Sequence, residues 1–197
     1  MPADAPTSTT LLRTVRNGDD RAAWDRFDTA YREMLLRFCR SRGVQHADAE
    51  DVIQRVFFKL VGGLKAFEYQ PGRGRFRDYL FKCVRSAMID LKVCPSMRAG
   101  QVSHAEEAAA GDAELEASWE REWVDHHYRT ALVSLRAHAQ EQSVAVLEMA
   151  LGGRSVPEIA ADLGMSEAAV YKAQQRMKDR LREIIAQQVR REDGLDD

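Results

Sequence analysis

The sequence predicts an all-α protein made of two small helical domains joined by a flexible linker. Apolar residues recur at three- and four-residue steps through most of the 197 residues, which is the period of an amphipathic helix. No segment shows the two-residue alternation that is typical of a strand. Between residues 93 and 116 the composition changes to small and polar residues, and such a stretch indicates a linker.

We expect the first domain to span residues 10–93 and to contain three main helices. The first is marked by evenly spaced apolar residues: Trp24, Phe27, Tyr31, Leu35 and Phe38. The second begins in the acidic run DAED, whose carboxylates favour a helix N-terminus, and ends at Gly62-Gly63. After a loop with Pro71, the third carries an apolar stripe: Phe76, Leu80, Cys83, Val84, Ala87 and Leu91. Of these, Phe76 and Leu80 are expected in the core.

The charge distribution suggests two basic bodies, an acidic linker over residues 94–128 and a second domain over residues 129–191. Residues 1–92 carry 17 Lys and Arg against 12 Asp and Glu, whereas residues 93–130 carry 3 against 8. Residues 131–191 carry 9 against 7, and the final EDGLDD is acidic. This segregation suggests that the bodies bind a polyanion, although many solvated helices are equally basic.

The segment SVPEIAADLGMSEAAVYKAQQRMKDRLREII predicts a helix, a tight turn and a second helix. Ser155 and Glu158 have the spacing of a capping box, and Pro157 falls in the first turn, where proline is tolerated. Gly164 suits a turn with positive φ, and Ser166 is placed to cap the second helix.

A DNA-binding helix-turn-helix has a small residue, a glycine and an apolar residue at the spacing found here: Ala160, Gly164 and Val170. A plain helical hairpin is the alternative. The start of the second helix would present its outward face to the major groove and to phosphates. That face consists of Ser166, Ala168, Ala169, Tyr171, Lys172, Gln175 and Arg176. Tyr171 and Gln175 are the better candidates for base edges.

The stretch DAEDVIQRVFFKLVGGLKAFEYQPGRGRFRDYLFKCVRSAMIDLK resembles region 2 of bacterial RNA polymerase sigma factors of the extracytoplasmic-function group. The matching features are the acidic AED, Gln54 followed by the pair Phe57 and Phe58, and a loop of the form F-x-Y-x-P-x-R-G-x-F-R-x-Y-L. The C-terminal body resembles region 4 of the same group. Together the resemblance covers most of residues 20–92 and 130–187.

The resemblance implies a protein that binds core RNA polymerase, recognises a promoter and helps to open it. Region 4 of the family reads the −35 element as duplex, and region 2 reads the −10 element and holds its non-template strand. The helix from Asp48 to Leu60 would dock on the clamp helices of the largest polymerase subunit; without the resemblance it is an ordinary capped amphipathic helix. The implied polymerase-binding residues are Asp48, Glu50, Asp51, Gln54 and Phe58.

Arginines and aromatic residues in and after the loop 65–77 are predicted to hold the single-stranded −10 DNA. A protein without ATP chemistry opens DNA by binding the open form better than the duplex, and base stacking on aromatic rings returns about 1–3 kcal/mol per base. The predicted residues are Lys65, Phe67, Tyr69, Arg73, Arg75, Arg77, Lys82 and Arg85. Phe67 and Tyr69 are equally consistent with packing under the loop.

Two features of the sequence depart from the family pattern. Arg55 stands where an acid commonly follows the glutamine, which puts the strength of the polymerase contact in doubt. Ala168, Ala169 and Ala173 replace longer polar or basic residues. We therefore expect −35 recognition to rely partly on phosphates and DNA shape.

No enzyme, cofactor or metal site is expected. The sequence has no GxxxxGKS/T loop, no GxSxG elbow and no HExxH motif. The residues that could suggest zinc are scattered along the predicted linker: Cys94, His104, His126 and His127. The odd number of cysteines (Cys39, Cys83 and Cys94) and the lack of a signal peptide or a long apolar run indicate the reduced cytoplasm.

Three classes of function compete at this point. A sigma subunit would have core polymerase and promoter DNA as partners, and the family is often held inactive by a dedicated anti-sigma protein. A stand-alone helix-turn-helix regulator would leave the arginine-rich loop and the acidic helix without a role. A recombinase-type enzyme would need a catalytic domain, commonly with strands, that the sequence does not indicate.

Overall fold

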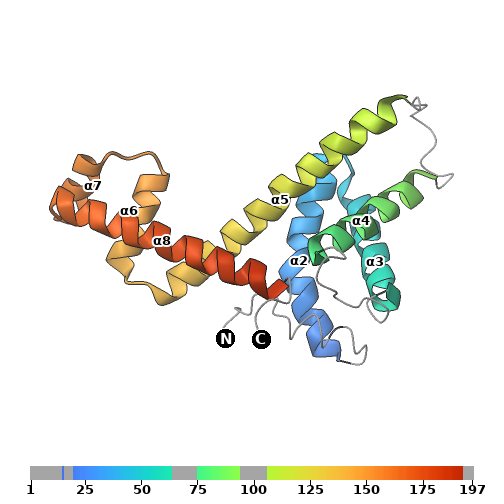
Figure 1. The fold of residues 1–197 in the computed structure, drawn as a ribbon, viewed down its shortest axis with the longest axis horizontal. Coiled ribbons are helices and arrows are strands. Elements are labelled where there is room, and N and C mark those ends of the chain that lie inside the picture. The colour runs from blue at the N-terminus through green and yellow to red at the C-terminus, as the bar shows by residue number, and fades with distance from the viewer. Residues whose placement is uncertain (1–14, 16–19, 64–74, 94–105, 193–197) are drawn as a thin grey trace. The chain divides into compact units, whose positions relative to one another are not determined.

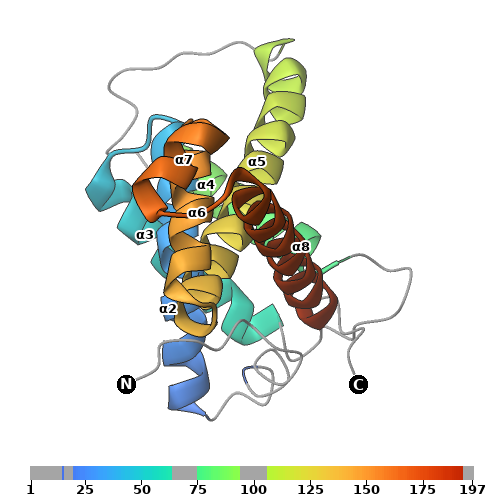
Figure 2. The same ribbon diagram turned by 90° about the vertical axis from the view of Figure 1, so that its left-hand side faces the viewer.

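The computed structural model describes residues 15, 20–63, 75–93 and 106–192. Their regular elements are all helices, and none of these residues lies in a strand (Figures 1 and 2). The described residues divide into two compact units. The N-terminal unit holds those up to His126 together with residues 190–192, and the C-terminal unit holds His127–Val189. The predicted all-α fold class is therefore confirmed.

The N-terminal unit is built on helices α2 (Arg21–Ser41), α3 (His46–Gly63) and α4 (Phe76–Val93). Asp20 caps α2, since its carboxylate accepts a hydrogen bond from the N–H of Ala23 at 3.1 Å. The largest side chains of its core are less than 2 % exposed: Phe27, Tyr31, Met34, Leu35, Phe38, Ile53, Leu60, Phe76 and Leu80. The predicted apolar stripes of the first and third helices thus face one core, with Trp24 half-buried at its edge. The buried side of α3 completes this core, and Phe57 is half-buried beside it.

Helix α5 (Glu106–His138) begins inside the predicted linker. Trp119 and Trp123 are 4 % and 5 % exposed and pack into the core of the N-terminal unit. The linker expected over residues 94–128 therefore differs from the structure after residue 105, whereas residues 94–105 lie outside the described part. The physical reason is that alanine and glutamate have high helix propensity, and two tryptophans four residues apart supply a buried side.

Ion pairs fasten α5 to the N-terminal unit at three places. Arg37 of α2 pairs with Glu122 at 2.5 Å, and Arg42, just after α2, pairs with Glu114 at 3.0 Å. Arg77 of α4 pairs with Glu120 at 2.6 Å. Three acidic residues of this segment are thus placed against basic residues in or just after α2 and in α4.

The C-terminal unit contains the end of α5 and helices α6 (Glu141–Leu151), α7 (Val156–Leu163) and α8 (Glu167–Glu192). One cluster of buried residues joins α5, α6 and α8: Ala131, Leu135, Leu147, Met177 and Leu181. A second joins α6, α7 and α8: Val146, Ile159, Ala160, Val170 and Ala173. Helices α7 and α8, separated by a tight turn, form the predicted helix-turn-helix.

Candidate nucleic-acid and protein interfaces

The outer face of α3 carries an exposed stripe formed by Asp51, Gln54, Phe58 and Val61, which we call the α3 stripe. The Phe58 side chain is 82 % exposed and Val61 is 43 % exposed, although Val56 and Leu60 on the opposite side are buried. Exposed aromatic and aliphatic side chains bordered by a carboxylate and an amide are typical of a protein-binding patch. The predicted polymerase-binding residues Asp51, Gln54 and Phe58 are thus brought onto one surface.

The two other predicted polymerase-binding residues lie at the start of α3 and are only half exposed. The Glu50 carboxylate accepts a hydrogen bond from the Arg32 guanidinium at 2.5 Å, and the same arginine pairs with Asp28 at 2.9 Å. The hydrogen bond that Arg32 donates to Asp28 is the main reason why the Arg32 pKa is raised, with Glu50 adding to it. Glu50 is therefore engaged within the unit, and Asp48 lies in the first turn of α3, where a carboxylate favours the helix N-terminus.

The predicted single-strand face is only partly described. Lys65, Phe67, Tyr69 and Arg73 lie outside the described residues. The Arg75 side chain is 54 % exposed just before α4, with a carboxylate oxygen of Asp78 at 3.7 Å.

Arg77, Lys82 and Arg85 lie on α4 and differ in their surroundings. Lys82 and Arg85 are exposed. Only 17 % of the Arg77 side chain is exposed, because the side chain lies against Glu120 of α5. In this structure Arg77 therefore fastens two helices together, a role that the sequence did not indicate.

The sequence also did not indicate a close contact between α3 and α4. A Cβ atom at Gly63 would lie 2.0 Å from the hydroxyl oxygen of Tyr79, so glycine leaves room for that ring at the end of α3. Burial raises the Tyr79 pKa to about 12, with the neighbouring Cys83 contributing. Nearby, Lys59 donates hydrogen bonds to Ser86 at 2.6 Å and Asp90 at 2.8 Å. These contacts set how α4 lies against α3.

The helix-turn-helix is capped as predicted. The Glu158 carboxylate accepts hydrogen bonds from the backbone N–H of Ser155 at 2.8 Å and from its hydroxyl at 2.7 Å. These two bonds lower the pKa of Glu158. Gly164 ends α7 with φ of +62°, a conformation that side chains with a Cβ rarely adopt. Ser166 accepts a hydrogen bond from the N–H of Ala169 at 3.2 Å and so caps α8.

The outward face of α8 contains most of the residues that the sequence predicted for it. Those exposed to solvent are Ser166, Ala168, Tyr171, Lys172, Gln175 and Arg176, and Ala169 is half-buried. Ala173 is 2 % exposed and packs against α6 and α7. The prediction that Ala173 leaves the outward face with fewer base-reading groups is therefore wrong, because Ala173 lies in the core, where a larger residue would not fit.

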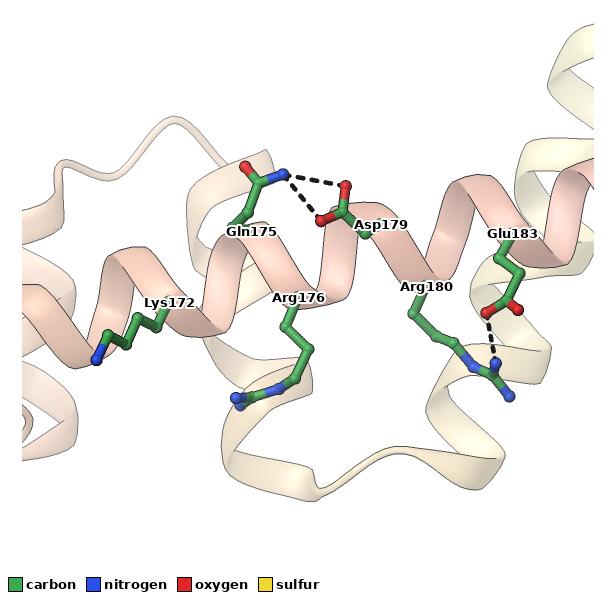
Figure 3. A pocket seen from close by; sticks show the side chains of 6 residues that line it. All are labelled: Lys172, Gln175, Arg176, Asp179, Arg180 and Glu183. Atoms are coloured by element: carbon green, nitrogen blue, oxygen red, sulfur yellow. Dashed lines mark hydrogen bonds and ion pairs between the residues drawn. The ribbon is translucent and has the colours of Figure 1, made fainter.

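The charged residues of α8 are held in different ways (Figure 3). Lys172 extends away from the helix, and Arg176 donates a hydrogen bond to the Ser143 hydroxyl of α6 at 3.1 Å. Arg180 pairs with Glu183 at 2.6 Å. The Gln175 amide faces Asp179, with Nε2 at 3.0 and 2.9 Å from the two carboxylate oxygens. A row of charged and amide groups thus follows the outward face for several turns.

The described residues give little support for a metal site or for a reactive cysteine. No group of three or more His, Cys, Asp or Glu side chains in them is placed to hold a metal ion. Cys39 and Cys83 are buried free cysteines, and Cys94 lies outside the described part. Burial raises the Cys39 pKa to about 11 and also raises that of Cys83. Both thiols are therefore protonated near neutral pH and poorly reactive. None of the described helices is long and apolar enough for a membrane crossing.

Comparison with known proteins finds a family similarity in the N-terminal part of the chain. Residues 27–93 match the family model described as Sigma-70 region 2. A solved structure with similarity to the chain is described as "Structure of CnrH in complex with the cytosolic domain of CnrY"; it is 23% identical, with a TM-score of 0.38, and the similarity covers 92% of this chain and 98% of that chain. No curated protein matches the sequence significantly. Residues 27–93, which include most of α2 and all of α3 and α4, are therefore similar to Sigma-70 region 2.

Proposed function

We propose that this protein is a promoter-specificity subunit of bacterial RNA polymerase, a sigma factor of the extracytoplasmic-function group. It binds core polymerase, recognises the −35 and −10 promoter elements and promotes opening of the DNA. The match of residues 27–93 to Sigma-70 region 2 carries this proposal. The role needs no catalysis by this chain, and it places the protein in the cytoplasm, where transcription takes place.

The α3 stripe supports the binding of core polymerase. Phe58, 82 % exposed, offers an aromatic anchor of the kind that supplies most of the affinity at protein interfaces. Asp51 and Gln54 are exposed beside it and supply polar contacts. Glu50, held by Arg32, and Asp48 contribute through the start of the same helix.

Two separate surfaces support DNA binding. The exposed face of α8 presents Tyr171 and Gln175 toward a major groove and Lys172 toward phosphates. At the N-terminal unit, Arg75, Lys82 and Arg85 form the described part of the single-strand face, to which Lys65, Phe67, Tyr69 and Arg73 are proposed to belong. Stacking of bases on the aromatic rings and attraction of the phosphates would favour the open form over the duplex.

Reconstitution with core RNA polymerase tests the proposal. We expect the full chain to bind core enzyme and to direct initiation from a subset of promoters that core alone does not use. Failure to bind core, combined with tight and specific binding of duplex DNA by the chain alone, would contradict the sigma role. That result would favour the stand-alone helix-turn-helix regulator.

A further inference from the structure

The end of α3 and the start of α4 meet at the ring of Tyr79. A Cβ atom added to Gly63, the last residue of α3, would lie 2.0 Å from the Tyr79 hydroxyl oxygen and 3.3 Å from Cζ. The same atom added to Gly62 would find nothing within 4 Å. Neither glycine has a positive φ, so only the space that the ring needs distinguishes Gly63 from its neighbour.

The surroundings of Tyr79 hold its ring in this place. The side chain is half-buried against the core of the N-terminal unit, and its hydroxyl shares a hydrogen bond with the Cys83 thiol, one turn further along α4. Phe76 and Leu80, which are 1 % and 0 % exposed, anchor the same turns of α4. A methyl group at Gly63 would therefore displace the ring, the end of α3, or both.

This contact lies where the chain leaves α3 for the proposed single-strand face. Gly63 is followed directly by the segment 64–74, which ends before Arg75, and the Arg75 side chain is 54 % exposed. The contact between Gly63 and Tyr79 thus sets the distance between the two ends of that segment. Groups that are held in position before binding lose less conformational entropy when they capture a ligand.

Other parts of α3 and α4 are attached independently of this contact. Lys59 donates hydrogen bonds to Ser86 at 2.6 Å and Asp90 at 2.8 Å, and these bonds fasten the second half of α4 to α3. Phe58, the exposed aromatic residue of the α3 stripe, lies more than one helical turn before Gly63. A change at Gly63 therefore acts on the two helix ends and spares the surface proposed to bind core polymerase.

We propose that Tyr79, packed against Gly63, is a positioning residue for promoter opening that holds the end of α3 to the start of α4. This inference rests on the proposed function of the N-terminal unit in capturing the −10 strand. The ring acts by fixing the two ends of the segment 64–74, so the role depends on its fit against the bare backbone of Gly63.

Two neighbouring glycines provide a matched pair of variants. Gly62→Ala and Gly63→Ala add the same methyl group and gain similar helix propensity, but only the second meets Tyr79. Holoenzymes formed from core polymerase and each full chain are compared by permanganate footprinting, at a temperature at which circular dichroism shows every variant to be folded. We expect Gly63→Ala to slow opening by at least about fivefold, as small misplacements at a functional site do. Gly62→Ala should open promoters at the wild-type rate, and both should bind core enzyme as the wild type does.

A substitution of Tyr79 tests whether its ring causes the defect. Tyr79→Phe removes the oxygen at 2.0 Å and leaves Cζ, at 3.3 Å, as the nearest atom to the added methyl group, a tight contact that a shift of a few tenths of an ångström relieves. We expect Tyr79→Phe alone to open promoters nearly as fast as the wild type. Gly63→Ala combined with Tyr79→Phe should recover most of the lost rate. In urea unfolding of the chain alone, Gly63→Ala should lower the midpoint when Tyr79 is present and not when it is phenylalanine.

Three results would overturn the inference. These are equal opening rates for Gly63→Ala and Gly62→Ala, no recovery when Tyr79→Phe is added to Gly63→Ala, and a loss of core affinity in Gly63→Ala that matches the loss of opening. A wild-type chain that does not bind core polymerase contradicts the proposed function, and this inference with it. If the wild type binds core and opens promoters, any of the three results contradicts the role of Tyr79 alone.

Discussion

Neighbouring residues of α3 show how one helix divides its side chains between stability and binding. Phe57 is half-buried and its ring packs edge-on against Phe27 and Trp24, with centroids 5.7 and 6.3 Å apart. Phe58, the next residue, is 82 % exposed and contributes little to folding. Phe58 is thus free to serve as the contact that the proposed polymerase interface would cover.

This division leads to a paired prediction. Phe58→Ala should change the free energy of unfolding by less than about 0.5 kcal/mol and weaken binding to core polymerase by more than about fivefold, as loss of an interface anchor does. Phe57→Ala should destabilise the N-terminal unit by about 2 kcal/mol because it removes buried aromatic surface. Urea unfolding and titration with labelled core enzyme measure the two quantities. Equal core affinity of Phe58→Ala and the wild type would contradict the assignment of the α3 stripe.

The capping carboxylate of α7 gives a prediction about pH. Hydrogen bonds from Ser155 lower the pKa of Glu158 in the folded chain. The ionised Glu158 carboxylate therefore contributes fully to stability above the pKa that it has in the unfolded state. This contribution is lost as the pH falls through the lower pKa of the folded state. Glu158→Gln should unfold at a lower temperature than the wild type at pH 7, and this difference should shrink at pH 3. Circular dichroism melts measure both, and a difference that is independent of pH would contradict the role of the charge.

At the scale of an element, α5 shows where the sequence predicted the fold poorly. The capping residues, Gly164 and the apolar spacing predicted α7 and α8 well, because these signals are local. The docking of α5 combines the burial of Trp119 and Trp123 with ion pairs between residues far apart in the chain, such as Arg37 and Glu122, and no local pattern reveals these partners. The same applies to Ala173, whose burial is set by packing against α6 and α7.

Adjacent residues of α5 test whether this helix is part of the N-terminal unit. Trp123 is 5 % exposed and stacks on Tyr31 with centroids 5.9 Å apart, whereas Val124 is 58 % exposed. Trp123→Ala should lower the free energy of unfolding by about 3–5 kcal/mol, and Val124→Ala should change it by less than about 0.5 kcal/mol. Urea denaturation followed by circular dichroism measures both. If Trp123→Ala changes the free energy of unfolding as little as Val124→Ala does, this segment behaves as the flexible linker that the composition suggested.

At the scale of the whole molecule, the proposed function assigns different steps of initiation to different surfaces. On this proposal, core binding depends on the α3 stripe, duplex recognition on α8, and opening on the arginines around the loop 65–77. Because these surfaces use separate residues, a substitution in one should impair one step and spare the others. The site residues predicted from the sequence can therefore be tested step by step, including those that lie outside the described part of the chain.

The arginines of the loop 65–77 allow a direct test of whether opening and core binding use separate residues. The double variant Arg73→Ala with Arg75→Ala should slow the formation of open complexes. It removes two positive charges that would attract the phosphates of the single strand while that strand is being captured. Core binding should stay unchanged. Permanganate footprinting of the −10 region measures opening, and titration with core enzyme measures binding. Arg21→Ala with Arg26→Ala removes the same charge from exposed positions on α2 and serves as the control. If both double variants slow opening equally, only the net charge matters; if the loop variant loses core binding and opening together, the loop is structural.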